Sequence, residues 1–145
     1  MNIIKHPDKR LRFICKEVTK IDSNIEKESK QIFDSLKSIG NSFTLINGLA
    51  ANQIGLERRI VVLKRLGNKY LTMINPEIVS SSFPVLSVEI CASLPKTIRI
   101  KRRKLFVKIR YQNLNGKYKS IDLFGLTSFT MQQEIDHLNG KLIID

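Results

Sequence analysis

Hydrophobic residues recur at helical spacing in two parts of the chain. The first series follows Ser23-Asn24-Ile25-Glu26, which has the form of a capping box, and continues to Gly40. Its apolar members are Ile25, Ile32, Phe33, Leu36 and Ile39. The second series, from about Thr127 to Leu138 with Gly140 as the stop, contains Met131, Ile135 and Leu138. Each series predicts a helix with one buried face.

Between these helices the pattern is typical of β-strands. Two hairpins are predicted, with strands at 60–66 and 70–74 around Gly67-Asn68-Lys69, and at 105–111 and 118–123 around Asn115-Gly116. The run Ser80-Ser81-Ser82-Phe83-Pro84 is expected to be a loose loop. The order of helix, several strands and helix predicts an α+β domain whose last helix packs against antiparallel sheets.

A chain of 145 residues can bury a single hydrophobic core, so residues 1–145 are expected to form one domain. No apolar run approaches the roughly 18 residues of a membrane span, so no membrane association is expected. The first residues contain Pro7 and charges where a signal peptide needs an apolar core, which indicates a cytoplasmic protein. Two cysteines make a disulfide framework unexpected.

A formal net charge of +12 favours polyanionic partners, such as nucleic acid or a ribosome, although Lys-rich surfaces also aid solubility. The only dense charge run is Lys101-Arg102-Arg103-Lys104. No recognition motif or aromatic platform interleaves with the Lys and Arg residues along the sequence, which disfavours a direct nucleic-acid binder.

The segment Gln132-Gln133-Glu134-Ile135-Asp136-His137 differs by one residue from H-E-x-x-H, a helical motif that binds a metal through two histidines. Positions 133 and 137 share one face of a helix, so Gln133 stands where a second imidazole would be. A catalytic metal generally needs three protein ligands, and a Cys91 thiolate would suit Zn²⁺ or Fe²⁺. Taken singly, Cys91 also fits a core position and His137 a structural one.

A third element is the run Gly48-Leu49-Ala50-Ala51-Asn52-Gln53-Ile54-Gly55. Gly48 permits a close backbone approach, and the amide of Gln53 can donate a hydrogen bond to a developing oxyanion. The alternative interpretation is a tightly packed turn with Gln53 facing water.

Together these elements resemble the polypeptide deformylase family over essentially the whole chain. The matching segments are His6 to Arg12 with the family's opening, Gly48 to Gly55 with its first motif (G-h-G-h-A-A-x-Q), Glu89 to Pro95 with its second (E-G-C-h-S), and Gln133 to Gly140 with its third (H-E-h-D-H-h-x-G). The resemblance implies a deformylase-like α+β fold and a metal-dependent amidase. Its substrate would be the formyl group on the N-terminal methionine of new polypeptides, in bacteria and organelles of bacterial descent.

The resemblance also implies roles by position. Cys91 and His137 would be metal ligands with Gln133 at the third position, and Glu134 would be the general base and acid. The oxyanion would be stabilised by Gln53 and the backbone N–H of Ala92. The substrate-binding residues would be Asn47, Gly48 and Ile90, with backbone groups around Gly48 aligning the peptide as an added strand.

Four differences from the family pattern are present. Gln133 is a weaker donor than histidine, so Fe²⁺ or Zn²⁺, or Ni²⁺ or Co²⁺ in their place, is expected to be weakly bound or absent. Ile90 and Ile46 replace family glycines, and Ile46 would be strained if its φ were positive. The sequence ends five residues after Gly140, so a domain without an extended C-terminal helix is expected.

Two functions therefore stay open. One is a deformylase with impaired or atypical activity toward N-formylmethionyl peptides. The other is a catalytically silent homologue that binds ribosomes, through a basic surface, or peptides. A zinc protease has only the E-x-x-H spacing of Glu134 and His137 in its favour, and the oligomeric state is not indicated.

Overall fold

The computed structural model describes residues 2–40 and 46–145, which form a mixed α+β fold around one antiparallel sheet. The strands are β1 (Gly48–Ala50), β2 (Ile60–Arg65), β3 (Lys69–Cys91), β4 (Leu94–Gln112) and β5 (Tyr118–Phe124), and they lie in the sheet in this order. The helices are α1 (Ser23–Gly40) and α2 (Leu126–Leu138), with short 3₁₀ helices η1 (Lys9–Arg12), η2 (Ala51–Ile54) and η3 (Leu66–Asn68). The predicted fold class is confirmed.

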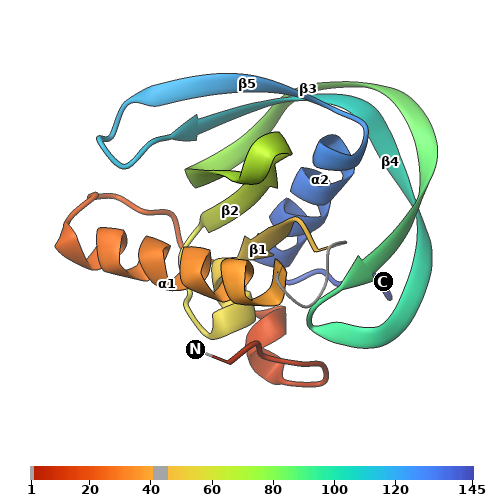
Figure 1. The fold of residues 1–145 in the computed structure, drawn as a ribbon, viewed down its shortest axis with the longest axis horizontal. Coiled ribbons are helices and arrows are strands. Elements are labelled where there is room, and N and C mark those ends of the chain that lie inside the picture. Colours follow the sequence, from red (N-terminus) through yellow and green to blue (C-terminus); the bar gives the residue numbers. More distant parts are fainter. Residues whose placement is uncertain (1, 41–45) are drawn as a thin grey trace.

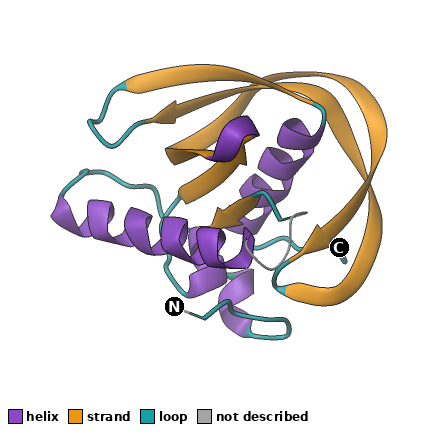
Figure 2. Ribbon diagram, viewed as in Figure 1, coloured by secondary structure: helices purple, strands orange, loops and turns teal. Residues whose placement is uncertain are grey.

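The long strands β3, β4 and β5 arch over α2, while α1 lies beside the short strands β1 and β2 (Figure 1). Figure 2 shows that most of the strand content lies in this curved arch. Its concave side holds α2, whose Met131, Ile135 and Leu138 pack in one core cluster with Val61 and Leu63 of β2. The motif-bearing helix is therefore held inside the sheet.

Strand β2 is buried on both faces, which explains its continuous run of apolar residues. Val61 and Leu63 face the cluster around α2, and the alternate residues Ile60 and Val62 face a second cluster. That second cluster includes Ile32 and other apolar residues of α1. The helical spacing at 23–40 thus identified the face of α1 that is buried.

The N-terminal cap of α1 lies one residue earlier than the sequence predicted. The backbone N–H of Ile25 donates to Asp22 Oδ1 at 3.1 Å, and the N–H of Glu26 donates to the Asp22 carbonyl at 3.1 Å. Asp22 is as good a capping residue as Ser23, and here it takes that position. The predicted capping box at Ser23 was therefore wrong, although the helix was right.

Both predicted hairpins are present, and the predicted loop at 80–84 is wrong. This run lies within β3, where Ser82 pairs with Phe106 and Pro84 with Lys104 of β4. The residues of this run are poor strand formers. They fit within β3 because its pairing with β4 has register irregularities and because Phe83 adopts a φ of 62°. Pro95 also lies within a strand, as the second residue of β4.

Among the described residues, no helix is both long enough and apolar enough to cross a bilayer.

Candidate active site

Helix α2 turns the degenerate motif toward the arch of the sheet. Gln133, Glu134 and His137 are 9%, 2% and 0% exposed, so all three lie in the interior. Residues 133 and 137 are one helical turn apart on the same face, as their spacing predicted. Asn52 of η2 fixes the end of this helix by donating from Nδ2 to the His137 carbonyl at 2.6 Å.

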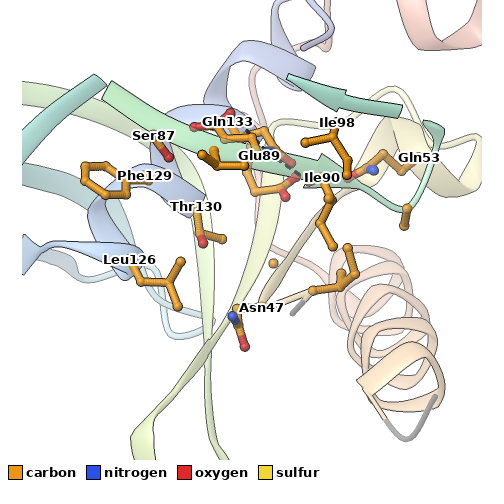
Figure 3. Close-up of a pocket in the computed structure, with 15 residues that line it drawn as sticks. Asn47, Gln53, Ser87, Glu89, Ile90, Ile98, Leu126, Phe129, Thr130 and Gln133 are labelled. Atoms are coloured by element: carbon orange, nitrogen blue, oxygen red, sulfur yellow. Dashed lines mark hydrogen bonds between the residues drawn. The ribbon is translucent and has the colours of Figure 1, made fainter. Parts of the chain in front are cut away.

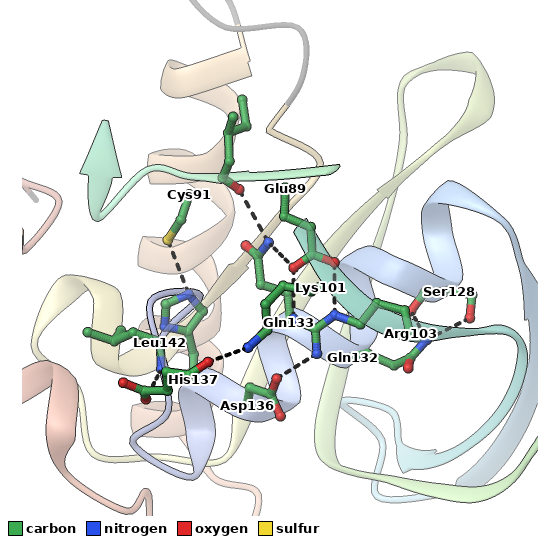
Figure 4. A network of polar contacts seen from close by, with 12 residues as sticks. Glu89, Cys91, Lys101, Arg103, Ser128, Gln132, Gln133, Asp136, His137 and Leu142 are labelled. Atoms are coloured by element: carbon green, nitrogen blue, oxygen red, sulfur yellow. Dashed lines mark hydrogen bonds and ion pairs between the residues drawn. The ribbon is translucent and has the colours of Figure 1, made fainter. Parts of the chain in front are cut away.

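Cys91 and His137 converge, because β3 ends at Cys91 directly above the last turn of α2. The Cys91 Sγ and His137 Nε2 atoms are 3.2 Å apart (Figure 4). Burial lowers the pKa of His137 to about 4, so the imidazole is neutral, and its Nδ1 has no partner among the described residues. Burial, followed by the nearby Glu134 charge, raises the pKa of Cys91 to about 12. The pair is a neutral imidazole and a thiol that a cation would convert to a thiolate.

Glu134 lies beside this pair with an unpartnered oxygen. Burial, with a further contribution from Glu89, raises the pKa of Glu134 to about 8. Its Oε2 is buried and has no hydrogen-bond partner within residues 2–40 and 46–145. A carboxyl group whose pKa is near neutrality and whose oxygen is uncommitted has the properties of a general base.

Gln53 is 1% exposed, which excludes the interpretation that it faces water. Its Oε1 accepts from the Ala50 N–H at 2.9 Å, and this fixes the orientation of the amide. Its Nε2 points toward the cysteine, 3.6 Å from Cys91 Sγ and 3.1 Å from Ser93 Oγ. The amide therefore directs its NH₂ group toward Cys91 and Ser93.

Gly48 allows β1 to lie directly against α2. A Cβ atom at this position would be 2.7 Å from Thr130 Cγ2 and 3.0 Å from Glu134 Cγ, closer than real contacts allow. The glycine is required for this approach rather than for a positive φ. Ile46 is also relaxed, because the non-glycine residues with positive φ in the described ranges are Asn68, Asn75 and Phe83.

The Gln133 amide is oriented by two acceptors. Its Nε2 donates to Glu89 Oε1 and to the Ile90 carbonyl, both at 3.2 Å. Glu89 is itself held by Arg103, which donates to both carboxylate oxygens at 2.7 and 2.8 Å. Because both partners of Gln133 are acceptors, only its NH₂ group can face them. The amide oxygen therefore faces the other way, toward the side of Cys91 and His137 (Figure 4).

A cavity of about 270 Å³ is lined by Gln133 and Glu134, whereas Cys91 and His137 are not among its lining residues. Figure 3 shows Asn47, Gln53, Ile90 and Gln133 around it, with Ile98 and Leu126 at its margins. Gly48, Ala92 and Glu134 complete the predicted site residues that line it. Ile90 is part of the wall and leaves the cavity open, so the branched side chain does not fill the site.

Two polar residues of the site were missed by sequence reasoning. Arg103 is 7% exposed, binds Glu89, and also donates to Asp136 Oδ2 at 2.6 Å. Arg103 stands within the charge run at 101–104, which is therefore not a uniform basic patch. Alternation offered a signal, since Val107 and Ile109 share its side of β4 and are buried. Glu89 is the first residue of the second motif, and the sequence alone indicates no role for it.

Comparison with known proteins agrees with this geometry. The sequence profile described as polypeptide deformylase matches residues 1–145. The chain belongs to this family. A peptide deformylase of Buchnera aphidicola subsp. Schizaphis graminum is 35% identical over 147 residues, covering 100% of this chain and 85% of the relative. A Thermotoga petrophila peptide deformylase is 39% identical over 95% of this chain and 81% of the relative. The crystal structure of peptide deformylase from Thermotoga maritima superposes with a TM-score of 0.90 at 34% identity, covering 99% of this chain and 95% of the other.

Peptide deformylases are metal-dependent hydrolases, and the residues present fit a divalent cation with one weak donor. No three His, Cys, Asp or Glu side chains form a metal-ligand group in the described part of this chain. Two strong donors nevertheless meet at 3.2 Å, and the Gln133 oxygen is directed to their side. Sulfur, imidazole nitrogen and amide oxygen form a mixed donor set that Fe²⁺ or Zn²⁺ can accept.

Proposed function

We propose that this protein removes the formyl group from N-formylmethionyl peptides. The observation that carries the proposal is the contact of Cys91 Sγ with His137 Nε2 at 3.2 Å, beside the uncommitted Glu134 carboxyl. This pair lies next to a cavity whose wall includes Gln53 and Gly48. A merely structural cysteine and histidine would not need a buried carboxyl with a free oxygen beside them.

Cys91, His137 and the Gln133 oxygen would hold the cation. When bound, the cation would polarise the formyl carbonyl and make a water molecule more acidic. Glu134 would take a proton from that water and return it to the amine of the departing methionine, which releases formate. Its raised pKa, about 8, suits a group that both accepts and donates a proton near neutrality.

Donors around the cavity would stabilise the oxyanion that develops during attack. The orientation of the Gln53 amide is fixed by the Ala50 contact, which leaves Nε2 as the group that can donate at the site. The backbone N–H of Ala92 would be a second donor, and it depends little on the side chain at that position. Asn47, Gly48 and Ile90 would contact the peptide, which can extend the sheet at β1, its edge strand.

The activity is expected to be atypical because Gln133 supplies a neutral oxygen. Changes beyond the ligands themselves already weaken metal binding by about 10- to 100-fold, so a changed ligand should cost at least as much. Fe²⁺ or Zn²⁺ would be the native metal, with Ni²⁺ or Co²⁺ able to replace it. The compartment would be a bacterial-type cytoplasm or an organelle, where formylated chains are made.

Formate release from a formyl-Met peptide, measured anaerobically with Fe²⁺, Ni²⁺, Co²⁺ or Zn²⁺, tests the proposal. Turnover should occur with at least one metal and should be lost in Glu134→Gln, which keeps the size of the side chain. Gln133→His should raise the metal affinity and the turnover. If neither the native chain nor Gln133→His releases formate with any metal, the proposed function is wrong.

One observation favours the silent homologue as a second candidate. The described residues supply two strong metal donors rather than three, so a metal-free protein that only binds peptides or ribosomes is consistent with the site. Equilibrium binding of formyl-Met peptides without formate release, at saturating metal, would support this alternative. Hydrolysis under the same conditions would exclude it.

A further inference from the structure

The convex face of β3, β4 and β5 carries a second set of chemically distinct side chains. Arg103, Val107 and Ile109 of β4 point into the interior. By alternation the even-numbered residues point outward, and they read Arg102, Lys104, Phe106, Lys108 and Arg110. Phe106 therefore lies at the middle of this row, with two cationic side chains before it and two after it.

Phe106 is the centre of an aromatic row that crosses three strands. Its ring centroid lies 5.7 Å from that of Phe83 on β3 and 5.2 Å from that of Phe124 on β5. Phe83, Phe106 and Phe124 are 66%, 40% and 63% exposed. The expectation that no aromatic platform accompanies the cations is wrong, because residues distant in sequence are joined by strand pairing.

Phe83 joins this row through an unfavourable backbone conformation. Its neighbours Ser82 and Pro84 pair with the outward-facing Phe106 and Lys104, so regular alternation would turn Phe83 inward. Instead its φ is 62°, which is an outlier for a bulky residue, and its ring contacts Phe106. Strain of this kind is found at binding sites, where it presents a side chain that regular structure would hide.

The cations on this face are only partly neutralised. Lys108 lies 4.0 Å from Asp122, and Arg110 lies 3.7 Å from Glu77. Arg102 and Lys104 have no ion pair within the part of the chain that the structure describes. Because the whole chain has a formal net charge of +12, these two unpaired residues favour the binding of a polyanion.

We propose that the face centred on Phe106 binds a single-stranded segment of RNA. Exposed rings beside unpaired cations are the two features that single strands need, because bases stack on the rings while phosphates meet the cations. The exposed Leu86 pairs with Arg102 and borders this face, whereas Val88 and Ile98 lie at the end of the hairpin that lines the catalytic cavity. The choice of RNA over DNA rests on the proposed function, because an enzyme of nascent chains works beside RNA.

Fluorescence anisotropy with an end-labelled single-stranded RNA of about 12 mixed-sequence nucleotides tests this inference. Phe106→Ala should weaken binding by at least about fivefold, the lower limit for loss of one stacked base. Phe124→Ala should do the same, and it provides a second variant if Phe106→Ala does not fold. The matched control is Phe13→Ala, whose ring is 42% exposed elsewhere on the molecule, and its affinity should not change.

The salt dependence tests the cations separately. Each phosphate contact contributes about −0.7 to the slope of log affinity against log salt for single strands, so Arg102→Gln with Lys104→Gln should reduce the slope by about 1.4. Lys20→Gln with Lys27→Gln removes the same charge from other exposed positions and should leave the slope almost unchanged.

Three outcomes would overturn the proposal. The first is RNA binding that is unaffected by both phenylalanine changes. The second is an equal reduction of the salt slope in the Arg102→Gln, Lys104→Gln variant and in the Lys20→Gln, Lys27→Gln variant. That result would show that binding depends on net charge and not on this face. The third is a Phe106-dependent affinity for anionic lipid vesicles, or for a second copy of the chain in sedimentation, without one for RNA. These measurements need neither metal nor peptide, so they are independent of whether formate is released.

Discussion

Gln133 has an amide where the family has an imidazole, but its side chain keeps the position of a metal ligand. Histidine would present a ring nitrogen at this point, whereas the amide presents either NH₂ or oxygen, depending on what lies behind it. Glu89 decides between them, because both of its side-chain oxygens accept hydrogen bonds from Arg103. An ionised carboxylate can only accept, so the oxygen of Gln133 is left for the site.

Replacing Glu89 should therefore weaken metal binding, although Glu89 is not itself a proposed metal ligand. In Glu89→Gln the new amide can donate as well as accept, so Gln133 is free to turn over. We expect the dissociation constant for Co²⁺ to rise by about 10- to 100-fold, measured by competition with a chelator on protein shown to be folded by circular dichroism. Glu77→Gln, on the outer face of β3, is the matched control. An unchanged constant in Glu89→Gln would contradict the positioning role.

Gly48 gives a prediction that concerns packing alone. Gly48→Ala should destabilise the protein by about 1 to 3 kcal/mol, because the new methyl group meets Thr130 Cγ2 at 2.7 Å. Thr130→Ser removes that methyl group, so the cost of Gly48→Ala should be smaller in the serine background. Urea unfolding of the four proteins measures this coupling. Strict additivity would show that the clash is absorbed elsewhere.

At the scale of elements, what could be predicted depended on whether the determinants were local. The helices and both hairpins followed from periodicity and turn residues, as at Gly67 and Asn115-Gly116. The strand through Ser80 to Pro84 could not, because its partners come from residues 104–108, and pairing overrides a weak local preference. For the same reason the aromatic row was invisible in the sequence.

The site divides in the same way. Motif spacing placed Cys91, His137, Glu134 and Gln53, and the structure brings them together. The orientation of Gln133 was not predictable, since it depends on Arg103 reaching Glu89 across a strand pair. A run of charged residues predicts a solvated surface. The alternation of side chains along β4 shows instead that Arg103 points to the interior.

The C-terminal residues are tied to the body of the protein by charged contacts that acid should break. Asp145 accepts from Arg12 Nη1 at 2.6 Å and from the Leu142 N–H at 2.8 Å. The Arg12 hydrogen bond is the largest cause that lowers the pKa of Asp145, from 3.8 to about 2. A lowered pKa stabilises the fold above the ordinary value and ceases to do so as the pH falls from about 4 to about 2.

Asp145→Asn measures this contribution. At pH 6 the variant should be less stable by at most about 1 kcal/mol, since the pair is partly exposed and screened. The difference should shrink toward zero near pH 2, as followed by urea unfolding across the acid range. Asp34→Asn, which removes one exposed pair on α1, is the control. A difference that persists undiminished at pH 2 would exclude the charge contact as its cause.

At the scale of the whole molecule, the β3–β4 hairpin carries the two proposed sites on opposite faces. Its inner face carries Glu89, Cys91 and Arg103 toward α2, and its outer face carries Phe106 and its cations. Sites that share no contacts generally behave additively. Phe106→Ala should therefore leave formate release from a short peptide within about twofold of the native rate while it weakens RNA binding. A parallel loss of both would show that the faces are coupled.

The proposed function depends most on the convergence of Cys91, His137 and the Gln133 oxygen on one cation. Anaerobic titration with Co²⁺, followed by electronic absorption, tests it most directly, because cobalt bound to a thiolate gives a sulfur-to-metal charge-transfer band. We predict this band with one equivalent of Co²⁺, its loss in Cys91→Ala and a tighter titration in Gln133→His. Stoichiometric cobalt binding that is unchanged in Cys91→Ala would contradict the account.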